Sequence, residues 1–284
     1  MRTTIHFTKM SGAGNDFIVV DNMTRRLSVD YARMAKAVCS RHFGIGADGL
    51  LILEPGQDCD FFMRYYNADG SYGGMCGNGG RCIARYAFLA GISGRKPRFA
   101  ALDHVYEADV LEASVKLCMK APKVLKDKVL AHDTSGVFVD TGSPHFVCEI
   151  ADVNTVDVTS VGRAIRMHRA FAPDGCNVNF IERIGQNQLS LRTYERGVEA
   201  ETLACGTGSV AAAISAAVWH QMPSPIEVRV RSGESVHVSF DRKDDVFSNV
   251  ILEGSAHVLF SGVFEYETES NVILDPKSIQ RIGQ

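Results

Sequence analysis

The sequence lacks the long apolar runs and the runs of like charge that mark several classes of protein. No segment of its 284 residues approaches the roughly 18 consecutive apolar residues expected of a membrane-spanning helix. Its 30 Lys and Arg are balanced by 33 Asp and Glu, so the formal net charge is only -3. We therefore expect no nucleic-acid partner and no membrane partner.

Signatures of metal and nucleotide binding are also absent. No Cys-x-x-Cys pair occurs, and Cys76 and Cys82, six residues apart, have no companion pair downstream. The glycine-rich segments GAGNDF and GIGADG do not match the dinucleotide fingerprint, and no P-loop motif occurs. We assign those glycines to tight turns, and we expect no metal and no cofactor.

The cysteines bear on the cellular compartment. There are eight of them, an even number that would permit disulfides in a secreted protein. The opening residues MRTTIHF enter an alternating, strand-like pattern instead of the apolar stretch of a signal peptide. We therefore expect reduced thiols and a cytoplasmic protein.

Hydrophobic periodicity predicts many strands and four helices. Period-two alternation predicts strands at Thr3–Phe7, Gln188–Arg192, Ile226–Arg231 and Ser235–Phe240. Helical spacing predicts amphipathic surface helices at Val29–His42 and Val158–His168. Gly77–Ala90 and Gly206–His220 also have helical character, and the second is so rich in alanine that we expect it to be buried inside a sheet.

A faint twofold repeat suggests a duplicated domain. Phe17 lies 59 residues before Cys76, and Phe146 lies 59 residues before Cys205. In both halves a glycine turn, a strand, an Arg-x-Tyr strand and a Cys-Gly helix start follow in the same order. The repeat predicts an N-terminal half over 1–125 and a C-terminal half over 126–262, with the boundary in the stretch APKVLKDKVLA at 121–131.

The Cys-Gly pairs carry the candidate chemistry. Each precedes a helix, so Cys76 and Cys205 are expected at helix N-termini, where free amides and the helix dipole favour anions and lower a thiol's pKa. The amides that follow each cysteine could bind a carboxylate, and the glycines permit close approach. These amides belong to Gly77, Asn78, Gly206 and Thr207.

Two such thiols suit the inversion of a stereocentre. If a pseudo-twofold axis relates the halves, the sulfurs should face each other, so that one removes a proton and the other delivers one to the opposite face. The helix N-termini would stabilise the carbanion through its carboxylate. The alternative is that both are buried structural cysteines, as free cysteines often are; their recurrence in matching halves favours the catalytic interpretation.

Five separated motifs, GAGNDF, NADGS, MCGNGGRC, YERG and ACGTG, resemble the diaminopimelate epimerase family along almost the whole chain. The resemblance implies an α+β fold of two pseudo-twofold-related α/β domains, each a curved, mostly antiparallel sheet wrapped around a central helix. It implies that 263–284 return to the first domain. It also implies interconversion of LL- and meso-diaminopimelate without pyridoxal phosphate, in the biosynthesis of lysine and peptidoglycan precursor.

By the same resemblance, Cys76 and Cys205 are the acid–base pair, and Gly77, Asn78, Gly206 and Thr207 hold the reacting carboxylate. Further substrate contacts are implied for Asn15, Asn67, Asn177, Glu195 and Arg196, and a role in setting the cysteine pKa values for His145 and Glu195. From the residues alone, Glu195 and Arg196 would be surface charges, and Asn15 and Asn67 would be turn residues. The chain has Gly49 and Ser143 where some members have Gln and Asn, which affects the expected contacts to the distal group.

Two alternatives remain at this stage. Proline racemases and hydroxyproline epimerases use two cysteines in a similar fold, but typically have Cys-Gly-His-Gly where this chain has Asn78. A thiol redox or metal-binding protein is the non-enzyme alternative. The Val- and Phe-rich stretch 247–264 is compatible with strand pairing across a homodimer and equally with an ordinary core.

Overall fold

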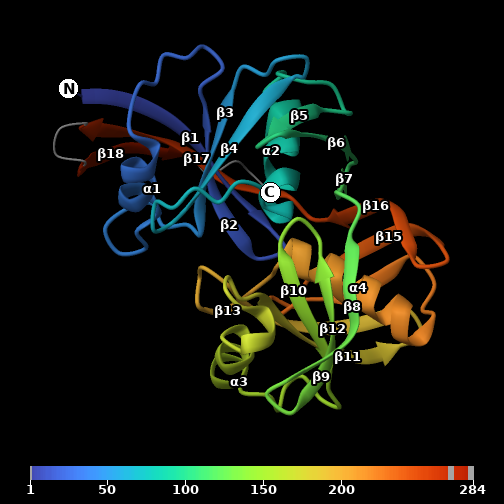
Figure 1. The fold of residues 1–284 in the computed structure, drawn as a ribbon. Helices are drawn as coiled ribbons and strands as arrows, with labels where there is room; N and C mark the ends of the chain where they lie inside the picture. The colour runs from blue at the N-terminus through green and yellow to red at the C-terminus, as the bar shows by residue number, and fades with distance from the viewer. Residues whose placement is uncertain (1, 268–271, 281–284) are drawn as a thin grey trace. The chain divides into compact units, whose positions relative to one another are not determined.

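A computed structural model describes residues 2–267 and 272–280 of the chain. Internal contacts divide it into two compact units. The first comprises Met1–Leu117 together with Ser255–Gln284, and the second comprises Cys118–Gly254. Figure 1 shows the ribbon of both units.

The first unit is one twisted sheet with two helices. Its strands are hydrogen-bonded in the order β18-β17-β1-β2-β3-β4-β5-β6-β7. The pairs β2–β3 and β4–β5 are parallel, and the other pairs are antiparallel. The elements are β1 Arg2–Gly12, β2 Asn15–Asp21, α1 Tyr31–Cys39, β3 Gly49–Glu54, β4 Phe61–Asn67, α2 Gly77–Leu89, β5 Arg98–Ala101, β6 His104–Val110, β7 Val115–Cys118, β17 His257–Glu267 and β18 Val272–Gln280.

The second unit follows the same plan. Its strand order is β8-β9-β10-β11-β12-β14-β15-β16, with the short β13 paired to β12, and the pairs β10–β11 and β12–β14 are parallel. The elements are β8 Lys123–Ala131, β9 Thr134–Asp140, β10 Pro144–Glu149, α3 Val158–Arg166, the 3-10 helix η1 Arg169–Phe171, β11 Asn177–Gly185, β12 Gln188–Glu195, β13 Ala200–Thr202, α4 Gly206–His220, β14 Ile226–Arg229, β15 Ser235–Lys243 and β16 Val246–Gly254.

The connectivity of the two units repeats element by element. In each, a parallel strand pair is joined through an outer helix, α1 or α3, and a second parallel pair is joined through an inner helix, α2 or α4. The strand β17 pairs with β1 as β8 pairs with β9. The C-terminal strands therefore complete the first sheet from the far end of the chain.

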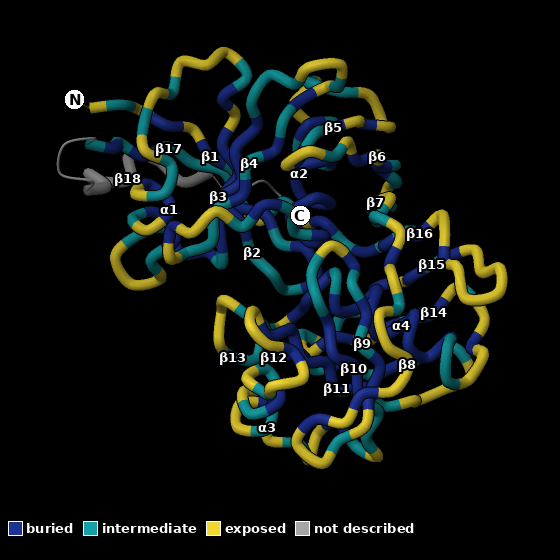
Figure 2. The backbone as a smooth tube through the Cα atoms, viewed as in Figure 1, coloured by how far each residue is buried: buried dark blue, intermediate teal, exposed yellow. Residues whose placement is uncertain are grey.

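The inner helices pack against their own sheets. Helix α2 contacts β1, β2, β3, β4 and β6, whereas α4 contacts β9, β10, β11, β12, β14, β15 and β16. From Gly208 to Ala217 every residue of α4 is buried (Figure 2), because its alanines and serines let strands approach from all sides. The outer helices α1 and α3 are amphipathic, and each begins at an aspartate cap, Asp30 or Asp157.

The structure confirms the predicted strands, the four predicted helices and the α+β class with a mostly antiparallel sheet around a central helix in each half. The boundary differs from the expected 121–131, because Lys123–Ala131 is the strand β8 of the second unit. It is a mostly exposed edge strand, so its polar composition is that of a linker.

The stretch 247–264 contributes to β16 and β17, and Ser261–Glu267 of β17 has a hydrogen-bonded neighbour on both edges. That part of β17 offers no free edge for pairing across a dimer. Of the segment expected to return to the first domain, residues 268–271 and 281–284 lie outside the described residues. Among the residues that are described, no helix is long and apolar enough to cross a membrane.

Candidate active site

The two Cys-Gly motifs form matching helix starts. Cys76 is the N-cap of α2, with φ -123° and ψ 125°, and its Sγ accepts a hydrogen bond from Gly79 N at 3.5 Å. Cys205 is the N-cap of α4, with φ -121° and ψ 112°, and its Sγ accepts from Gly208 N at 3.4 Å. Each sulfur thus takes the capping place usually held by a serine or aspartate oxygen, where a negative charge is favoured.

Amide side chains surround Cys76. The Sγ of Cys76 lies 3.6 Å from Asn15 Oδ1, and Asn78 Nδ2 donates to the same oxygen at 3.3 Å. Asn15 begins β2, directly after the Ala13-Gly14 turn, in which both residues have positive φ. The predicted site residues Asn15, Cys76, Gly77 and Asn78 therefore lie together in the first unit.

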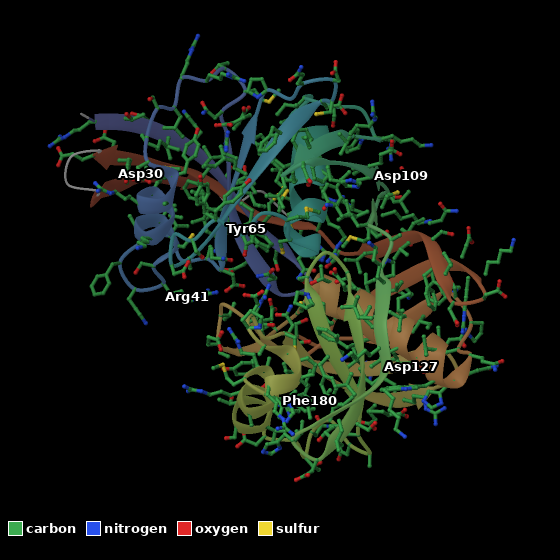
Figure 3. The ribbon with its side chains drawn as sticks, in the orientation of Figure 1. Asp30, Arg41, Tyr65, Asp109, Asp127 and Phe180 are labelled. Carbon is green, nitrogen blue, oxygen red and sulfur yellow. The ribbon has the colours of Figure 1, made fainter. Side chains whose placement is uncertain are left out.

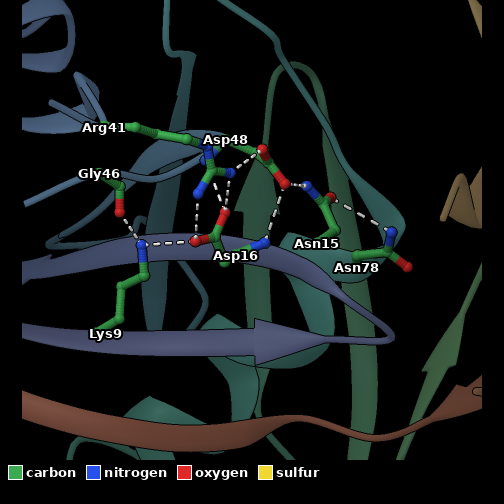
Figure 4. A network of polar contacts seen from close by, with 7 residues as sticks. All are labelled: Lys9, Asn15, Asp16, Arg41, Gly46, Asp48 and Asn78. Atoms are coloured by element: carbon green, nitrogen blue, oxygen red, sulfur yellow. Dashed lines mark hydrogen bonds and ion pairs between the residues drawn. The ribbon is translucent and has the colours of Figure 1, made fainter. Parts of the chain in front are cut away.

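A group of charged residues is hydrogen-bonded to Asn15 on the side away from Asn78 (Figure 4). Asn15 Nδ2 donates to Asp48 Oδ2 at 2.7 Å, and Arg41, in the loop after α1 (Figure 3), binds Asp48 at 2.7 Å and Asp16 at 2.9 Å. Lys9, buried in β1, binds Asp16 at 2.7 Å and also donates to Gly46 O. Burial works to raise the pKa of Asp16, but Lys9 and Arg41 outweigh it and hold that pKa below its usual value.

A fully buried arginine lies inside the same unit. Arg81, one turn into α2, donates from Nη2 to Asn78 Oδ1 at 3.0 Å and from Nε to Ser255 O at 3.3 Å. Because a guanidinium can only donate, it fixes the orientation of the Asn78 amide. Arg81 therefore positions a predicted substrate-binding side chain.

Asn67 lies at the end of β4, opposite Gly49 of β3. Tyr65 Oη donates to its Oδ1 at 2.6 Å, and its Nδ2 donates to Ser71 Oγ at 2.9 Å. Ala68 N donates to Asp48 O at 3.0 Å. Asn67 is thus next to the strand end that carries Asp48, on the same side of the unit as Asn15.

Hydroxyl groups surround Cys205 in the second unit. Thr207 Oγ1 lies 3.5 Å from the Sγ of Cys205 and 3.5 Å from Ser143 Oγ. Ser143 Oγ lies 2.9 Å from His145 Nε2. The path from His145 to the sulfur therefore runs through two hydroxyls, and one of them belongs to Ser143, a position where the sequence departs from the family pattern.

The protonation of His145 follows from its neighbours. Asn179 Nδ2 lies 3.0 Å from His145 Nδ1, and it must be a donor because it also binds the Phe146 carbonyl at 3.2 Å. The ring hydrogen then resides on Nε2 and points to Ser143. Complete burial is the main reason why the pKa of His145 falls to about 3; the contact with Asn179 opposes the shift and the charge of Arg196 adds to it, so the ring is neutral near pH 7.

The remaining predicted residues extend this half-site. Asn177 Oδ1 accepts from Arg196 N at 2.9 Å, and Asn177 Nδ2 donates to Pro144 O at 3.3 Å. Glu195, which ends β12, accepts a short hydrogen bond from Thr202 Oγ1. The second unit therefore brings together Cys205, Gly206 and Thr207 near Ser143 and His145, and Asn177 connects the neighbouring Pro144 carbonyl to the Glu195–Arg196 strand end.

Cysteines elsewhere in the chain have a different environment. Burial raises the pKa of Cys39, Cys148 and Cys176 to about 12 in each case, so these thiols are inert structural residues. Within the described part of the chain, no group of three or more His, Cys, Asp or Glu side chains is placed to hold a metal ion.

Several residues of the two half-sites were not found from the sequence. Asp48, Arg41, Lys9 and Arg81 in the first unit and Asn179 in the second have no role in the predicted set. Only one signal pointed to any of them: Asn177 and Asn179 alternate in the strand sequence NVN, so that both face the same side.

Comparison with known proteins decides the family. The diaminopimelate epimerase family model matches residues 7–118 and 137–257, ranges that contain all of the predicted site residues. The chain belongs to the diaminopimelate epimerase family. It is 46% identical over 257 residues to the diaminopimelate epimerase of Chlorobaculum tepidum, which covers 89% of this chain and 98% of that protein. The enzyme of Aquifex aeolicus is 40% identical over 273 residues, covering 91% and 97%.

Solved structures show how widely the fold occurs. A phenazine biosynthesis protein of the PhzF family from Bacillus anthracis superposes with a TM-score of 0.71 at 15% identity, covering 93% of this chain and 99% of that chain. A hydroxyproline epimerase from Agrobacterium vitis superposes with a TM-score of 0.70 at 14% identity, covering 97% and 94%. At such identities the fold alone is shared with the diaminopimelate epimerase family.

Proposed function

We propose that this chain interconverts LL- and meso-diaminopimelate without a cofactor, using Cys76 and Cys205 as its acid–base pair. The proposal is supported by membership of the diaminopimelate epimerase family and by relatives of that name along nearly the whole chain. The structural observation that carries it is the pair of cysteine-capped inner helices, each with Sγ accepting from the third helical amide.

In the proposed reaction, one cysteine as thiolate removes the α-proton and the other as thiol delivers its proton to the opposite face of the carbon. Charge and protons balance, because the two sulfurs exchange their protonation states in each turnover. The mechanism requires both sulfurs to reach one substrate carbon. Proton transfer of this kind contributes about 10² to 10⁴ to the rate.

The carbanion must be stabilised through its carboxylate. We assign this to the first amides of the two inner helices, from Gly77 and Asn78 and from Gly206 and Thr207, which point out of the helix N-termini. They provide fixed dipoles where negative charge develops, without the cost of reorganising water.

The distal amino-acid group of diaminopimelate needs a cation and several acceptors. We assign Arg196 to its carboxylate, since a planar guanidinium binds a carboxylate through two hydrogen bonds. Glu195 and the amide oxygens of Asn15, Asn67 and Asn177 are assigned to the remaining polar contacts. His145, neutral and linked through hydroxyls to Cys205, is assigned with Glu195 to setting the cysteine pKa values.

We place this activity in the cytoplasm, in the biosynthesis of lysine and peptidoglycan precursor. The nearest alternative, a proline racemase or hydroxyproline epimerase, has the same fold, but this chain carries Asn78 where that group typically has histidine. Assembly as a homodimer stays a prediction.

Proton NMR of LL-diaminopimelate in D₂O, with reduced enzyme and no added cofactor, tests the proposal. We expect the α-proton signal to decay as the meso isomer appears. A C59A variant is the matched control, because the Cys59 thiol donates to the nearby Phe61 carbonyl and belongs to neither helix start. Inertness towards diaminopimelate together with turnover of proline or hydroxyproline would move the substrate to the alternative.

A further inference from the structure

The loop motif GIGADG, residues 44–49, has no part in the proposed reaction, yet its aspartate reaches the candidate site. Asp48 precedes β3 and is partly buried. Its Oδ2 accepts from Asn15 Nδ2 at 2.7 Å and from Asp16 N at 3.2 Å, while its Oδ1 accepts from Arg41 Nη2 at 2.7 Å. The carboxylate thus connects the charged group to Asn15 (Figure 4).

These contacts determine which way the Asn15 amide faces. An ionised carboxylate can only accept, so the NH₂ of Asn15 must face Asp48. Its Oδ1 is then turned to Asn78 Nδ2 at 3.3 Å and to the Sγ of Cys76 at 3.6 Å. The orientation of Asn78 is fixed independently, because Arg81 Nη2 donates to Asn78 Oδ1 at 3.0 Å.

The orientation of the Asn15 amide decides whether the Cys76 sulfur meets a hydrogen-bond acceptor or a donor. An acceptor facing Cys76 stabilises its S–H, whereas a flipped Asn15 would present a donor and stabilise the thiolate. The charged groups in the described surroundings are Lys9, Asp16, Arg41 and Asp48 on one side of Asn15 and Arg81 beyond Asn78. Of these charged groups, Asp48 is the one that is hydrogen-bonded to the Asn15 side chain.

We propose that Asp48 is a positioning residue for the epimerisation, holding Asn15 with its amide oxygen towards Cys76 and Asn78. This inference rests on the proposed function. Asp48 acts on Cys76 through Asn15, and the largely exposed Arg41 orients the Asp48 carboxylate. Since the Arg41 side chain is 56% exposed, its ion pairs contribute little by themselves.

A series of variants separates these roles. D48A removes the acceptor, and we expect kcat/KM to fall about 10- to 100-fold, because misplacement of a site group has effects of that size. D48N should stay within about threefold of wild type: two donors, Asn15 Nδ2 and Asp16 N, converge on one oxygen position and keep the amide oxygen there. R41M should also lose less than about threefold.

The matched control is D60A. Asp60 is an exposed carboxylate of the same unit, and its Oδ2 accepts from the backbone amide of Arg98 at 2.8 Å. Its removal should leave kcat/KM unchanged. If D48A performs as well as D60A, the positioning role is wrong.

A double-mutant cycle distinguishes positioning from general stability. If Asp48 acts through Asn15, D48A should change kcat/KM by less than about twofold in an N15A background, because residues in one network couple. An undiminished loss in that background overturns the proposal. Thermal unfolding of each variant shows whether it is folded.

A chemical readout does not depend on turnover. Trypsin cleaves after Arg64 and Arg81, so the peptide with Cys76 is separated from Cys82, and mass spectrometry can follow alkylation of Cys76 against pH. In D48A the midpoint should move to lower pH by about 0.5 to 1, the worth of one hydrogen bond, with an unchanged rate at high pH. An unmoved midpoint contradicts the proposal. Wild-type protein inert towards diaminopimelate would overturn the proposed function, while this measurement would still test Asp48.

Discussion

The two half-sites share the same backbone arrangement, but the groups beside their strand starts are charged in the first and neutral in the second. At the start of the parallel pair β2–β3, Asp48 N donates to Asp16 O at 3.0 Å, and both carboxylates are bound by cations. At the corresponding place in β10–β11, His145 is opposite Asn177, and its ring contacts the neutral side chains of Ser143, Asn177 and Asn179. Next to these strand starts the first half-site has ion pairs and is called the ionic half-site; the second has amides and hydroxyls there and is called the neutral half-site, although Glu195 and Arg196 lie at its strand end.

This difference shows which part of the duplicated unit is constrained. The cysteine cap, the glycine at the third helical position and the parallel strand pair are the same in both units. The groups that orient the cap's neighbours differ, and so do the atoms that meet the sulfurs: an amide oxygen at Cys76 and a hydroxyl at Cys205. A thiol is stabilised by a hydrogen-bond acceptor and a thiolate by a donor. An acceptor at one sulfur and a hydroxyl, which can donate, at the other are therefore compatible with a pair in which one cysteine is a thiol while the other is a thiolate.

The largest effect is expected from the sulfurs themselves. C76A and C205A should each lower epimerisation by at least about 1000-fold, because each removes one of the two proton-transferring groups. Full conversion of LL-diaminopimelate by either variant, followed by NMR next to the C59A control, would show that the two half-sites are not both required. One of the two N-cap cysteines would then be catalytic and the other structural.

The cysteine caps could be predicted because a local signal and a repeat agreed. Cys-Gly before a helical pattern predicts an N-cap, and the second copy raised both above chance. The surrounding groups could not be predicted in this way. Lys9 lies on the same alternating face of β1 as the buried Ile5 and Phe7, but a lysine at such a position gives no sign of being buried, and its partner Asp16 lies on the neighbouring strand β2.

Long-range contacts account for the other omissions. Asp48 is 33 residues from Asn15 in sequence, and its role exists only because β2 and β3 are parallel neighbours. Asn179 reaches His145 across 34 residues through the β10–β11 pair. The expected boundary was misplaced for a related reason, since the polar edge strand β8 has the composition of a linker.

Removing the buried Lys9–Asp16 ion pair of the ionic half-site should strongly destabilise the first unit. The Lys9 side chain is 6% exposed and its partner Asp16 17%, so K9M leaves a largely buried carboxylate without its nearest cation. We expect a loss of about 3 to 5 kcal/mol, as for other broken buried pairs. Hydrogen exchange read separately for the two units should place the loss in the first. K96M, at an exposed lysine of the same unit, is the control. Equal protection from hydrogen exchange in K9M and K96M would show that the Lys9–Asp16 pair does not contribute to stability.

The glycines at the third helical position, Gly79 and Gly208, should differ in how much stability an alanine substitution costs. A Cβ on Gly208 would lie 2.5 Å from Asn179 Oδ1 and 3.2 Å from the Sγ of Cys205, whereas one on Gly79 would lie 3.2 Å from a Leu51 methyl group. Asn179 is held by Thr193 Oγ1 at 3.1 Å and cannot easily move. G208A should therefore cost about 1 to 3 kcal/mol.

G79A should cost less than about 1 kcal/mol, because the Leu51 side chain can shift and alanine favours the helix. Urea denaturation of the two variants makes the comparison. A larger loss in G79A than in G208A would mean that the neutral half-site is the more adaptable one.

The dependence of stability on pH also separates the two halves. The folded His145 has a pKa of about 3 against 6.5 for an ordinary histidine, so below about pH 6.5 only the unfolded chain takes up this proton. The free energy of unfolding should therefore decrease as the pH falls through this range, by up to about 1.4 kcal/mol per pH unit for this group. H145Q should remove that slope between pH 6.5 and 5, whereas H42Q, at an exposed histidine, should keep it.

The ionic half should respond only in stronger acid. Because Lys9 and Arg41 hold the pKa of Asp16 below its usual 3.8, its contribution is complete above that value and is lost as the pH falls below it. Unit-resolved hydrogen exchange at pH 5 should thus show the second unit already weakened relative to pH 7 and the Asp16 region unchanged. Equal weakening of both at pH 5 would contradict the assignment of neutral and ionic half-sites.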